Sequence, residues 1–394
     1  MIRNFANKVG LITEKSILLK EHIAHPRKEK QAKMQTAINY CNAKTFAVNT
    51  KLEDVFTFEH LYESAKKCCR NVRWKTSTQN FEHEMMLNVH KLKKSVLNET
   101  FKSKGFHQFT ICERGKTREI KSLHITERAV QKCLCDYYLT PVFTPSFIYD
   151  NGACLKGKGT GFAIKRLKHH LHKFWQENHT NKGYILLLDI KSFFNSINHQ
   201  VLIDIVGKKV KDPKILKLFA YLVHCFGGEC GLGLGSQISQ VSASIYLNKL
   251  DHYVKDIKGQ KYYGRYMDDA YVISKDKKTL EDLLEGIKVV LGELKLQLSP
   301  NKTHILNLSN GFTYLKREFR LFENGKLNVK PYKPNIRRYC RKYKKLLKKN
   351  LSREKLKALE ITFKGYLQEF NYIDRYTRRI IYGYFKRTHT WLDF

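Results

Sequence analysis

The sequence predicts an α+β fold in which an antiparallel sheet packs beside amphipathic helices, and three observations support it. The stretch 262–274, Tyr-Tyr-Gly-Arg-Tyr-Met-Asp-Asp-Ala-Tyr-Val-Ile-Ser, places β-prone runs on either side of an acidic pair, which is typical of a β-hairpin. The run 184–190, Tyr-Ile-Leu-Leu-Leu-Asp-Ile, indicates a buried strand. Apolar residues recur at helical spacing over 58–69, 80–98 and 280–294.

Three carboxylates lie within these expected strands. Asp268 and Asp269 are adjacent at the hairpin turn, and Asp189 interrupts the buried run. Neighbouring acids repel each other and a buried acid is costly without a partner, so a cation is expected beside them. Mg²⁺ prefers hard oxygen ligands and takes few of them from protein. The set suits two-metal nucleotidyl transfer; for the acidic pair taken alone, a solvated turn is the alternative.

The charge of the chain indicates a polyanionic partner. Its 394 residues include 73 Lys and Arg against 36 Asp and Glu, which gives a net charge of +37. Such an excess favours nucleic acid as the partner and predicts binding that weakens steeply with salt. A general lysine bias with solvated side chains is the alternative. An apolar fraction of 42% is enough for a real core.

Cysteine usage and hydropathy predict a cytoplasmic protein that does not contact membranes. The ten cysteines are scattered and no Cys-x-x-Cys pair occurs, so neither a zinc module nor a disulfide framework is expected. The start of the chain lacks the apolar core of a signal peptide. No apolar run approaches the length of a membrane span.

The motifs around the acids resemble the palm of a reverse transcriptase. They are Tyr-Met-Asp-Asp at 266–269 on a hairpin and Asp-Ile-Lys-Ser-Phe-Phe at 189–194 upstream of it. The resemblance covers about residues 58–320 and implies an RNA-directed DNA polymerase with a right-hand fold. Such a fold has fingers, a palm with an antiparallel sheet and the catalytic hairpin, and a helical thumb.

This resemblance implies a division of the chain and a metal site. The expected parts are a basic N-terminal extension (1–55), N-terminal helices and fingers (56–182), the palm (183–328) and a helical thumb with the C-terminal region (329–394). The catalytic residues would be Asp189, Asp268 and Asp269. Together with Ile190 they would hold Mg²⁺, for which Mn²⁺ is a substitute.

The resemblance also assigns residues to the incoming dNTP. They are Lys116, Arg118, Phe194, Gly235, Gln240 and Lys302. Basic residues on a hairpin at 109–120 would neutralise the triphosphate. An aromatic ring at position 194 would reject a ribose 2′-hydroxyl, although composition alone does not separate it from its neighbour Phe193. Lys302 would protonate or neutralise the leaving pyrophosphate.

A further set is assigned to the template and primer. It comprises Lys156, Lys158, Arg166, Tyr266, Met267, Arg337 and Arg341. The first three belong to a Gly-rich stretch and the helix after it, where glycines allow close approach to a nucleic-acid backbone. The last two belong to a basic helical stretch that would grip a duplex along its phosphates. For each basic residue, a solvated surface side chain is the alternative.

The stretch 232–240 departs from the usual family pattern. It reads Leu-Gly-Leu-Gly-Ser-Gln-Ile-Ser-Gln, where most reverse transcriptases have Leu-Pro-Gln-Gly. In this respect the chain resembles the enzymes of diversity-generating retroelements and defence-associated bacterial groups. In those relatives the apolar residue accompanies relaxed copying.

These features predict an enzyme that copies a structured non-coding RNA into DNA in antiviral defence, with an accessory protein or a second copy of the chain as a further partner. A diversity-generating retroelement enzyme is the second biological interpretation. A polymerase of the same fold that works without a template or from a protein primer is an alternative activity. A non-catalytic RNA-binding scaffold is an alternative from another class.

Overall fold

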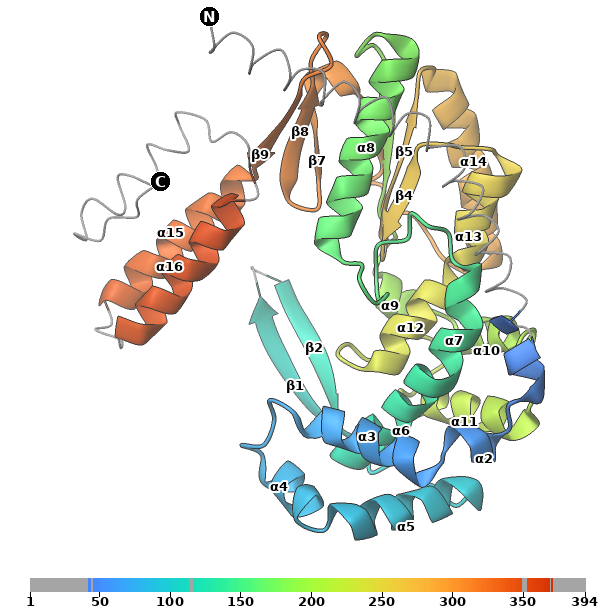
Figure 1. Ribbon diagram of the computed structural model, residues 1–394. Helices are drawn as coiled ribbons and strands as arrows, with labels where there is room; N and C mark the ends of the chain where they lie inside the picture. The colour runs from blue at the N-terminus through green and yellow to red at the C-terminus, as the bar shows by residue number, and fades with distance from the viewer. Residues whose placement is uncertain (1–41, 44, 114–115, 349–352, 369, 371–394) are drawn as a thin grey trace, which may run out of the picture. The chain divides into compact units, whose positions relative to one another are not determined.

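The computed structural model of the protein describes residues 42–43, 45–113, 116–348, 353–368 and 370 (Figure 1). The expected extension at 1–55 therefore lies largely outside the described residues. The chain divides into two compact units. The first combines the described residues up to Phe147 with His199–Ile245, and the second combines Ile148–Asn198 with the described residues from Tyr246 onward. Within the described ranges, no helix has both the length and the apolar character needed to cross a bilayer.

The first unit is mainly helical. Its elements are α2 (Leu52–Val55), α3 (Phe58–Cys69), α4 (Thr76–His83), α5 (Met85–Leu97), β1 (Phe106–Glu113), β2 (Lys116–Leu123), α6 (Ile125–Leu134), the π-helix η1 (Cys135–Leu139), α7 (Thr140–Phe143), the 3₁₀ turn η2 (Thr144–Ser146), α10 (His199–Gly207), α11 (Pro213–His224) and α12 (Gln237–Tyr246). Helix α3 matches the expected helix at 58–69. It begins at Thr57, whose hydroxyl accepts a hydrogen bond from His60 N, and it buries Leu61, Ala65 and Cys69.

The helix expected at 80–98 is instead two helices. The chain leaves helical geometry at Glu84, where φ is −111° and ψ is 40°. The amide of Asn88 donates to the carbonyl of Phe81 at 3.2 Å, so a carbonyl freed by the break keeps a partner. Apolar periodicity runs through the break, which is why the pattern alone does not reveal it.

The second unit holds the larger sheet. Its elements are α8 (Thr160–Asn178), β3 (Tyr184–Leu188), α9 (Phe193–Ser196), α13 (Asn248–His252), the π-helix η3 (Tyr253–Ile257), β4 (Tyr263–Tyr266), β5 (Asp269–Ser274), α14 (Lys277–Glu293), β6 (His304–Asn307), η4 (Leu308–Asn310), β7 (Phe312–Tyr314), β8 (Arg317–Leu321), β9 (Leu327–Pro331), α15 (Lys333–Lys348) and α16 (Arg353–Gln368). Four antiparallel strands pair in the order β4-β5-β3-β6. The expected strand and hairpin therefore lie side by side in one sheet.

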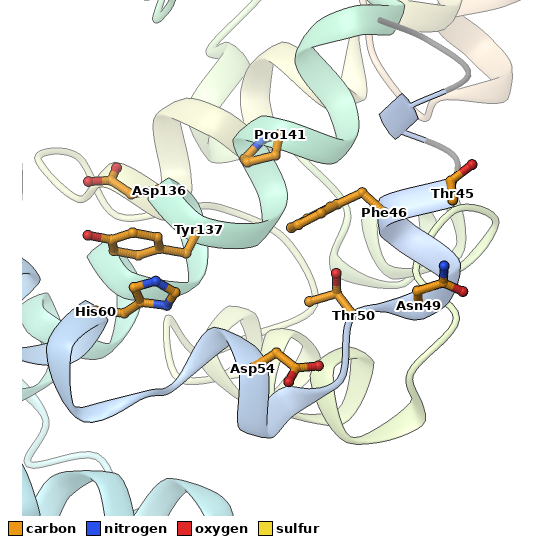
Figure 2. Close-up of a pocket in the computed structure, with 9 residues that line it drawn as sticks. All are labelled: Thr45, Phe46, Asn49, Thr50, Asp54, His60, Asp136, Tyr137 and Pro141. Atoms are coloured by element: carbon orange, nitrogen blue, oxygen red, sulfur yellow. The ribbon is translucent and has the colours of Figure 1, made fainter.

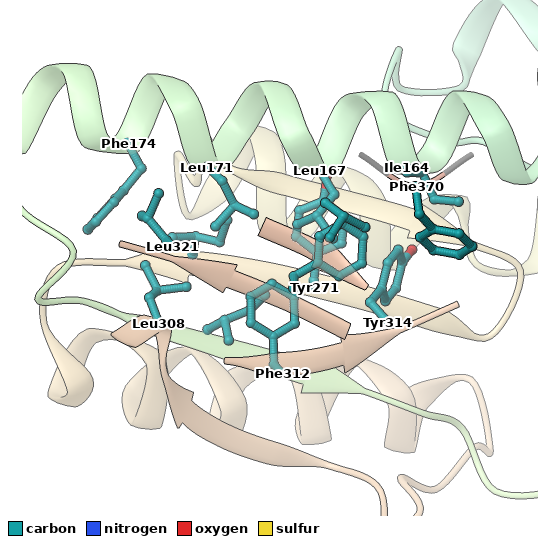
Figure 3. Close-up of a cluster of buried hydrophobic side chains, with 14 residues drawn as sticks. Ile164, Leu167, Leu171, Phe174, Tyr271, Leu308, Phe312, Tyr314, Leu321 and Phe370 are labelled. Carbon is teal, nitrogen blue, oxygen red and sulfur yellow. The ribbon is translucent and has the colours of Figure 1, made fainter. Parts of the chain in front are cut away.

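Helices cover the two faces of this sheet (Figure 1). On one face α8 packs its apolar stripe onto the strands, with Leu167, Leu171 and Phe174 buried against Ile185 and Tyr271 (Figure 3). On the other face α14 buries a stripe of its own at helical spacing. A sheet covered on both faces has nearly continuous apolar strands, as the run 184–188 shows.

Helix α13 and strand β4 are joined by an ion pair that is completely out of water. Arg265 is 1% exposed and Asp251 is 0% exposed. The guanidinium donates from Nε and Nη2 to the two carboxylate oxygens at 2.7 and 2.6 Å, and the hydroxyl of Tyr263 donates to the same carboxylate at 2.7 Å. A buried ion pair needs its hydrogen bonds to be made in this way to offset the cost of removing its charges from water.

A three-stranded sheet, β7-β8-β9, follows the larger one in the chain. Its first hairpin turns through Leu315 and Lys316, with φ angles of 44° and 60°. Two-residue hairpin turns of this hand usually contain glycine. Beyond it, α15 and α16 pack on each other through a small core that includes Ile336, Tyr343 and Phe363.

Replacement of Asp251 tests the buried ion pair. We expect Asp251→Asn to lower the free energy of unfolding by about 3–5 kcal/mol, because it leaves the Arg265 charge buried without a counter-ion. Urea denaturation followed by circular dichroism measures this. The control is Glu293→Gln, which removes the exposed pair between Lys249 and Glu293 and should change stability by less than about 1 kcal/mol. Equal effects of the two substitutions would refute the assignment.

Candidate active site

The acidic pair lies on the tight turn between β4 and β5. Tyr266 pairs with Asp269 across the hairpin, and Met267 and Asp268 form the two-residue loop. Met267 has a φ of 56°, in the left-handed region, which is costly for a residue with a side chain. Nη1 of Arg265 donates to the Met267 carbonyl at 3.0 Å and thereby supports this conformation. The buried ion pair thus also fixes the acidic turn.

Asp189 follows β3, the strand next to β5, and is 7% exposed. The segment after α14 runs beside it: Ser299 N donates to the Asp189 carbonyl at 2.8 Å, and Lys191 N donates to the Gln297 carbonyl at 2.9 Å. Ile190 is buried and forms an isolated bridge with Leu298. These backbone contacts fix Asp189 independently of its side chain.

The side chain of Lys302 forms an ion pair with Asp189. Its Nζ donates to both carboxylate oxygens, each at 2.7 Å. Burial lowers the pKa of Lys302, but the hydrogen bond and charge of Asp189, with the charges of Asp269 and Asp268, outweigh it and leave the pKa raised. The lysine is therefore charged and stays 54% exposed. The structure thus brings Lys302 to Asp189, and its role at the leaving pyrophosphate stays a prediction.

The charges of the three acids interact, and the pKa values of Asp269 and Asp268 change as a result. Burial, together with the charges of Asp268 and Asp189, raises the pKa of Asp269 to about 7. Burial also raises the pKa of Asp268, and the charge of Asp189 adds to this against a backbone hydrogen bond that lowers it. Such mutual repulsion is what a divalent cation relieves.

The donor set fits Mg²⁺, because all the available side-chain ligands are carboxylate oxygens. Asp189, Asp268 and Asp269 would hold it. Within the part of the chain that the structure describes, no three His, Cys, Asp or Glu side chains are already gathered tightly enough to enclose a metal ion. The ammonium of Lys302 lies directly on Asp189 in this conformation. The metal assignment stays a prediction, supported by the coupling of the acids.

A second, inner set of charges positions the β4 strand. The loop of Asp150–Gly152 lies along β4: Arg265 N donates to the Asp150 carbonyl at 3.1 Å, and Gly152 N donates to the Arg265 carbonyl at 2.8 Å. The Asp150 carboxylate pairs with Arg166 at 2.5 Å and with Lys255 at 2.8 Å. This ion-pair set ties α8 and η3 to the strand that carries the acidic turn.

Both ionisable groups at the centre of this set have shifted pKa values. Burial raises the pKa of Asp150, but Lys255, His170 and Arg166 outweigh it, so the pKa lies below its ordinary value. Burial lowers the pKa of His170 to about 3, so the ring is neutral at neutral pH. Its Nε2 accepts from Arg166 at 3.2 Å, and its Nδ1 donates to the Tyr271 hydroxyl at 3.0 Å.

Comparison with known proteins decides the family. Residues 93–319, more than half of the chain, match the family described as reverse transcriptase (RNA-dependent DNA polymerase). The chain belongs to the reverse transcriptase family. Its matched domain is that of an RNA-directed DNA polymerase, a nucleotidyltransferase, and the predicted α+β right-hand polymerase fold is confirmed.

Individual relatives are distant. Protein YkfC of Escherichia coli (strain K12) is 24% identical over 249 residues, which covers 51% of this chain and 62% of that protein. An uncharacterized 91 kDa protein in a cob intron of Schizosaccharomyces pombe is 26% identical over 147 residues, 32% of this chain and 18% of that protein. The reverse transcriptase chain therefore spans less than two thirds of either curated relative.

Solved structures that are similar include telomerases. Apo telomerase from Candida tropicalis has a TM-score of 0.45 at 14% identity, over 57% of this chain and 48% of that one. Telomerase from Candida albicans with a fragment of telomeric RNA has a TM-score of 0.42 at 11% identity, over 60% and 48% of the two chains. Likenesses of this size carry no inference about function.

The structure distinguishes Phe193 from Phe194 in this reverse transcriptase, which the sequence alone does not. Phe193 is 3% exposed and belongs to the core, whereas Phe194 beside it on α9 is partly exposed. The two rings meet edge to face at 5.5 Å between centroids. Only Phe194 has a face open to a ligand, which favours its assignment to the nucleotide sugar.

The basic residues expected to guide the template differ in their surroundings. Lys156 is exposed. Lys158 donates to the Tyr149 carbonyl at 2.6 Å and lies over the rings of Tyr149 and Phe162 at 4.9 and 4.8 Å. Arg166 is bound to Asp150. Lys158 and Arg166 have these partners within the protein, so Lys156 is the best placed of the three for a phosphate.

The remaining predicted contacts are divided between the two units of the reverse transcriptase. Lys116 and Arg118 lie in β2, paired with Glu113 and Ile111, and their side chains are outside the described set. In the same unit Gly235 has a φ of 101° and is exposed, as is Gln240 on α12. In the second unit, Tyr266 and Met267 are partly exposed, and Arg337 and Arg341 are exposed on α15.

The residues that sequence reasoning missed are Arg265, Asp251 and Asp150, whose partner Arg166 the sequence analysis assigned to the template instead. Arg265 interrupts an aromatic run and Asp150 follows one, and a charge in such a place needs a partner. That signal was available. It does not say which acid meets which base, because the partners are 14 positions apart for Asp251 and 16 for Arg166.

The shifted pKa of Asp269 predicts a pH-dependent stability. Between its ordinary value of 3.8 and about 7 the folded state holds a proton that the unfolded chain has lost, so stability falls as pH rises through this range. We expect Asp269→Asn to raise the free energy of unfolding by about 1–3 kcal/mol near pH 8 without divalent metal, and to have little effect near pH 4. Denaturant unfolding at both pH values measures this, with exposed Asp276→Asn as the control. A gain that is the same at both pH values would contradict the electrostatic explanation.

The exposure of Phe194 predicts a role in sugar selection. We expect Phe194→Val to reduce the ratio of kcat/KM for dNTPs over rNTPs by about tenfold or more, because it removes the ring that would meet the 2′-hydroxyl. Single-nucleotide incorporation with matched nucleotide pairs measures this. The control Phe193→Leu should lower stability and leave the ratio unchanged. If both variants keep the ratio, Phe194 has no part in selection.

Proposed function

We propose that this protein is an RNA-directed DNA polymerase that extends a primer with dNTPs, and that Asp189, Asp268 and Asp269 are its catalytic residues. The observation that carries the proposal is the electrostatic coupling of three acids on adjacent strands, with the pKa of Asp269 raised to about 7. A solvated turn would not produce that coupling. A basic chain that only bound RNA would gain nothing from repelling acids placed together.

Two magnesium ions, when bound, supply the Lewis acidity that activates a primer 3′-hydroxyl and neutralises the pyrophosphate. The residues of the chain hold the acids in position and supply a further positive charge. The Arg265 clamp fixes the turn that carries Asp268, and the Ser299 contact fixes Asp189. Lys302 holds a proton on Nζ within 2.7 Å of Asp189, and this is the proton we assign to the leaving pyrophosphate.

We assign the nucleotide sugar to Phe194 and the template and primer to basic and turn residues. The exposed face of α15, with Arg337 and Arg341, supports a contact along phosphates. Lys116 and Arg118 remain our assignment for the triphosphate, on the motif alone. These contacts make the affinity for nucleic acid dependent on salt.

We further propose that the template is a dedicated structured RNA and that the biological setting is antiviral defence, with a diversity-generating retroelement as the second setting. The support is the stretch 232–240, whose departure from Leu-Pro-Gln-Gly resembles those two groups. In the structure Leu234 is partly exposed and Gly235 is in the left-handed region. A side chain without polar groups there offers less to discriminate a nascent base pair.

Incorporation of labelled dNTPs by the purified protein with its co-purifying RNA tests the activity. We expect DNA synthesis that requires Mg²⁺, disappears after RNase pretreatment and yields a product whose sequence matches the bound RNA. Asp268→Asn should reduce incorporation by about 10²–10³-fold or more, the size seen when one stabiliser of transition-state charge is lost.

The matched control is Asp282→Asn, an exposed acid on α14 that should leave incorporation unchanged. DNA that persists after RNase, with a simple or repetitive sequence, would replace templated synthesis by the template-independent activity. If Asp268→Asn retains full activity in the cell, the protein is a scaffold and the proposal is wrong.

A further inference from the structure

A cavity of about 540 Å³ lies among the N-terminal helices of the first unit, in a part of the chain to which the polymerase proposal assigns no role (Figure 2). Its volume is in the range of small-molecule sites. The lining comes from the helical turn before α2, from α2 and α3, and from the π-helix η1 with α7. The residues are Thr45, Phe46, Asn49, Thr50, Asp54, His60, Asp136, Tyr137 and Pro141.

Aromatic rings form two walls of this cavity. His60 stacks on Tyr137 with ring centroids 3.8 Å apart and the planes inclined by 12°. Phe46 lies to one side of this pair in Figure 2; its ring packs on Tyr138 with 6.0 Å between centroids and is 36% exposed, so part of it is open to a ligand. An exposed aromatic face suits a flat π system, and an unstacked nucleobase is recognised in this way.

The charged groups of the cavity are hydrogen-bond acceptors, whereas the side chains of Asn49, Thr50 and Tyr137 can donate as well. Nδ1 of His60 lies 3.1 Å from the Val55 carbonyl, which only accepts, so Nδ1 carries a proton. Asp54 and Asp136 are carboxylates. Asp136 is already bound by Lys132 at 2.9 Å and by Gln237 at 2.5 Å. Asp54 accepts a hydrogen bond from Lys51 N at 2.8 Å through one oxygen.

A set of acceptors selects among the bases. Guanine presents two neighbouring donors on its Watson–Crick edge, the N1–H and the 2-amino group, and a carboxylate accepts both at once. Uracil presents one donor between two carbonyl oxygens, which a carboxylate repels. Adenine and cytosine present one amino donor beside a ring acceptor. A base edge that meets the Asp54 carboxylate is therefore most favourable for guanine and least favourable for uracil.

Two lysines contact residues that line the cavity and suit the phosphates that accompany a base. The Lys67 ammonium lies 6.0 Å from the centroid of the Tyr137 ring, and Lys132 pairs with Asp136. Two acids inside a chain of net charge +37 do not prevent nucleic-acid binding, because the surface charge draws the backbone while the acids meet a base edge.

We propose that this cavity binds a guanine base that is flipped out of an unpaired stretch of RNA, with the base between Phe46 and the His60–Tyr137 pair and its donor edge on Asp54. The reverse transcriptase would thus hold an RNA at a point other than the one it copies. The inference does not depend on catalysis, since it concerns binding in the absence of nucleotides and metal.

Fluorescence anisotropy with the full-length protein tests this. The probes are short labelled oligouridines that are unmodified or carry one central guanosine or one central inosine, which lacks the 2-amino group. We expect the guanosine strand to bind about tenfold or more tightly than oligouridine, as base stacking with added hydrogen bonds implies, and the inosine strand to be intermediate. Equal affinities for the three strands would overturn the proposal.

Matched variants locate the effect. Phe46→Ala should abolish the preference for guanosine, whereas Val48→Ala, an exposed neighbour on the same helical turn that does not line the cavity, should keep it. Asp54→Asn should reduce the preference, and Glu53→Gln, which removes the same charge one residue away, should not. If Phe46→Ala keeps the preference, guanosine is bound elsewhere and the proposal is wrong.

A competition experiment distinguishes a base within RNA from the base of a free nucleotide. Free guanosine 5′-monophosphate, with uridine 5′-monophosphate as its control, is titrated against the labelled guanosine strand. Displacement only at concentrations far above the affinity of the strand supports an RNA ligand. Displacement by the free nucleotide at comparable concentrations would overturn the assignment to RNA and make the cavity a nucleotide site.

Discussion

The pair of Arg265 and Asp251 is the interaction on which the unit that carries the acidic turn depends. Removing both charges from water costs several kcal/mol per ion, which only complete satisfaction of their hydrogen bonds offsets. Here the arginine does more than pair with an acid. Its side chain also binds the Met267 carbonyl, and its backbone binds the loop at Asp150. One residue therefore joins a helix, a loop and the acidic turn.

The site is rich in acids, whereas the chain as a whole is strongly basic, and the two kinds of charge have different roles. A surface rich in lysine and arginine attracts nucleic acid, while the acids are confined to adjacent strands under apolar cover. Burial makes the negative charge on Asp269 costly until a cation arrives. Lys302 partly fulfils that need from within the chain, through Asp189.

Much of the site could be predicted from the sequence because its signals are local. An acidic pair between two β-prone runs and a lone acid in an apolar run are visible in short windows, and the hairpin and β3 match them. The order β4-β5-β3-β6 is not local, and neither is the contact of Lys302 with Asp189, 113 positions away.

Other features required the structure for different physical reasons. Phe193 and Phe194 have the same chemistry, and only burial distinguishes them. The break at Glu84 leaves the apolar periodicity intact, so no pattern marks it. The left-handed turn at Leu315 and Lys316 occurs without glycine, against the usual residue preference, because the pairing of β7 with β8 determines the backbone there.

The division of the chain into two interleaved units has a consequence for its synthesis. The first unit needs His199–Ile245 for completion: Leu52 N donates to the Asp212 carboxylate at 3.0 Å, and Lys214 pairs with Glu53. On the ribosome, the core of the amino-terminal helices therefore cannot close until the chain has been translated to about residue 245 of 394. During that interval their apolar faces are exposed, so chaperones are expected to bind the nascent chain at this stage. A truncated product ending near Phe147 would keep those faces exposed and would be prone to aggregation.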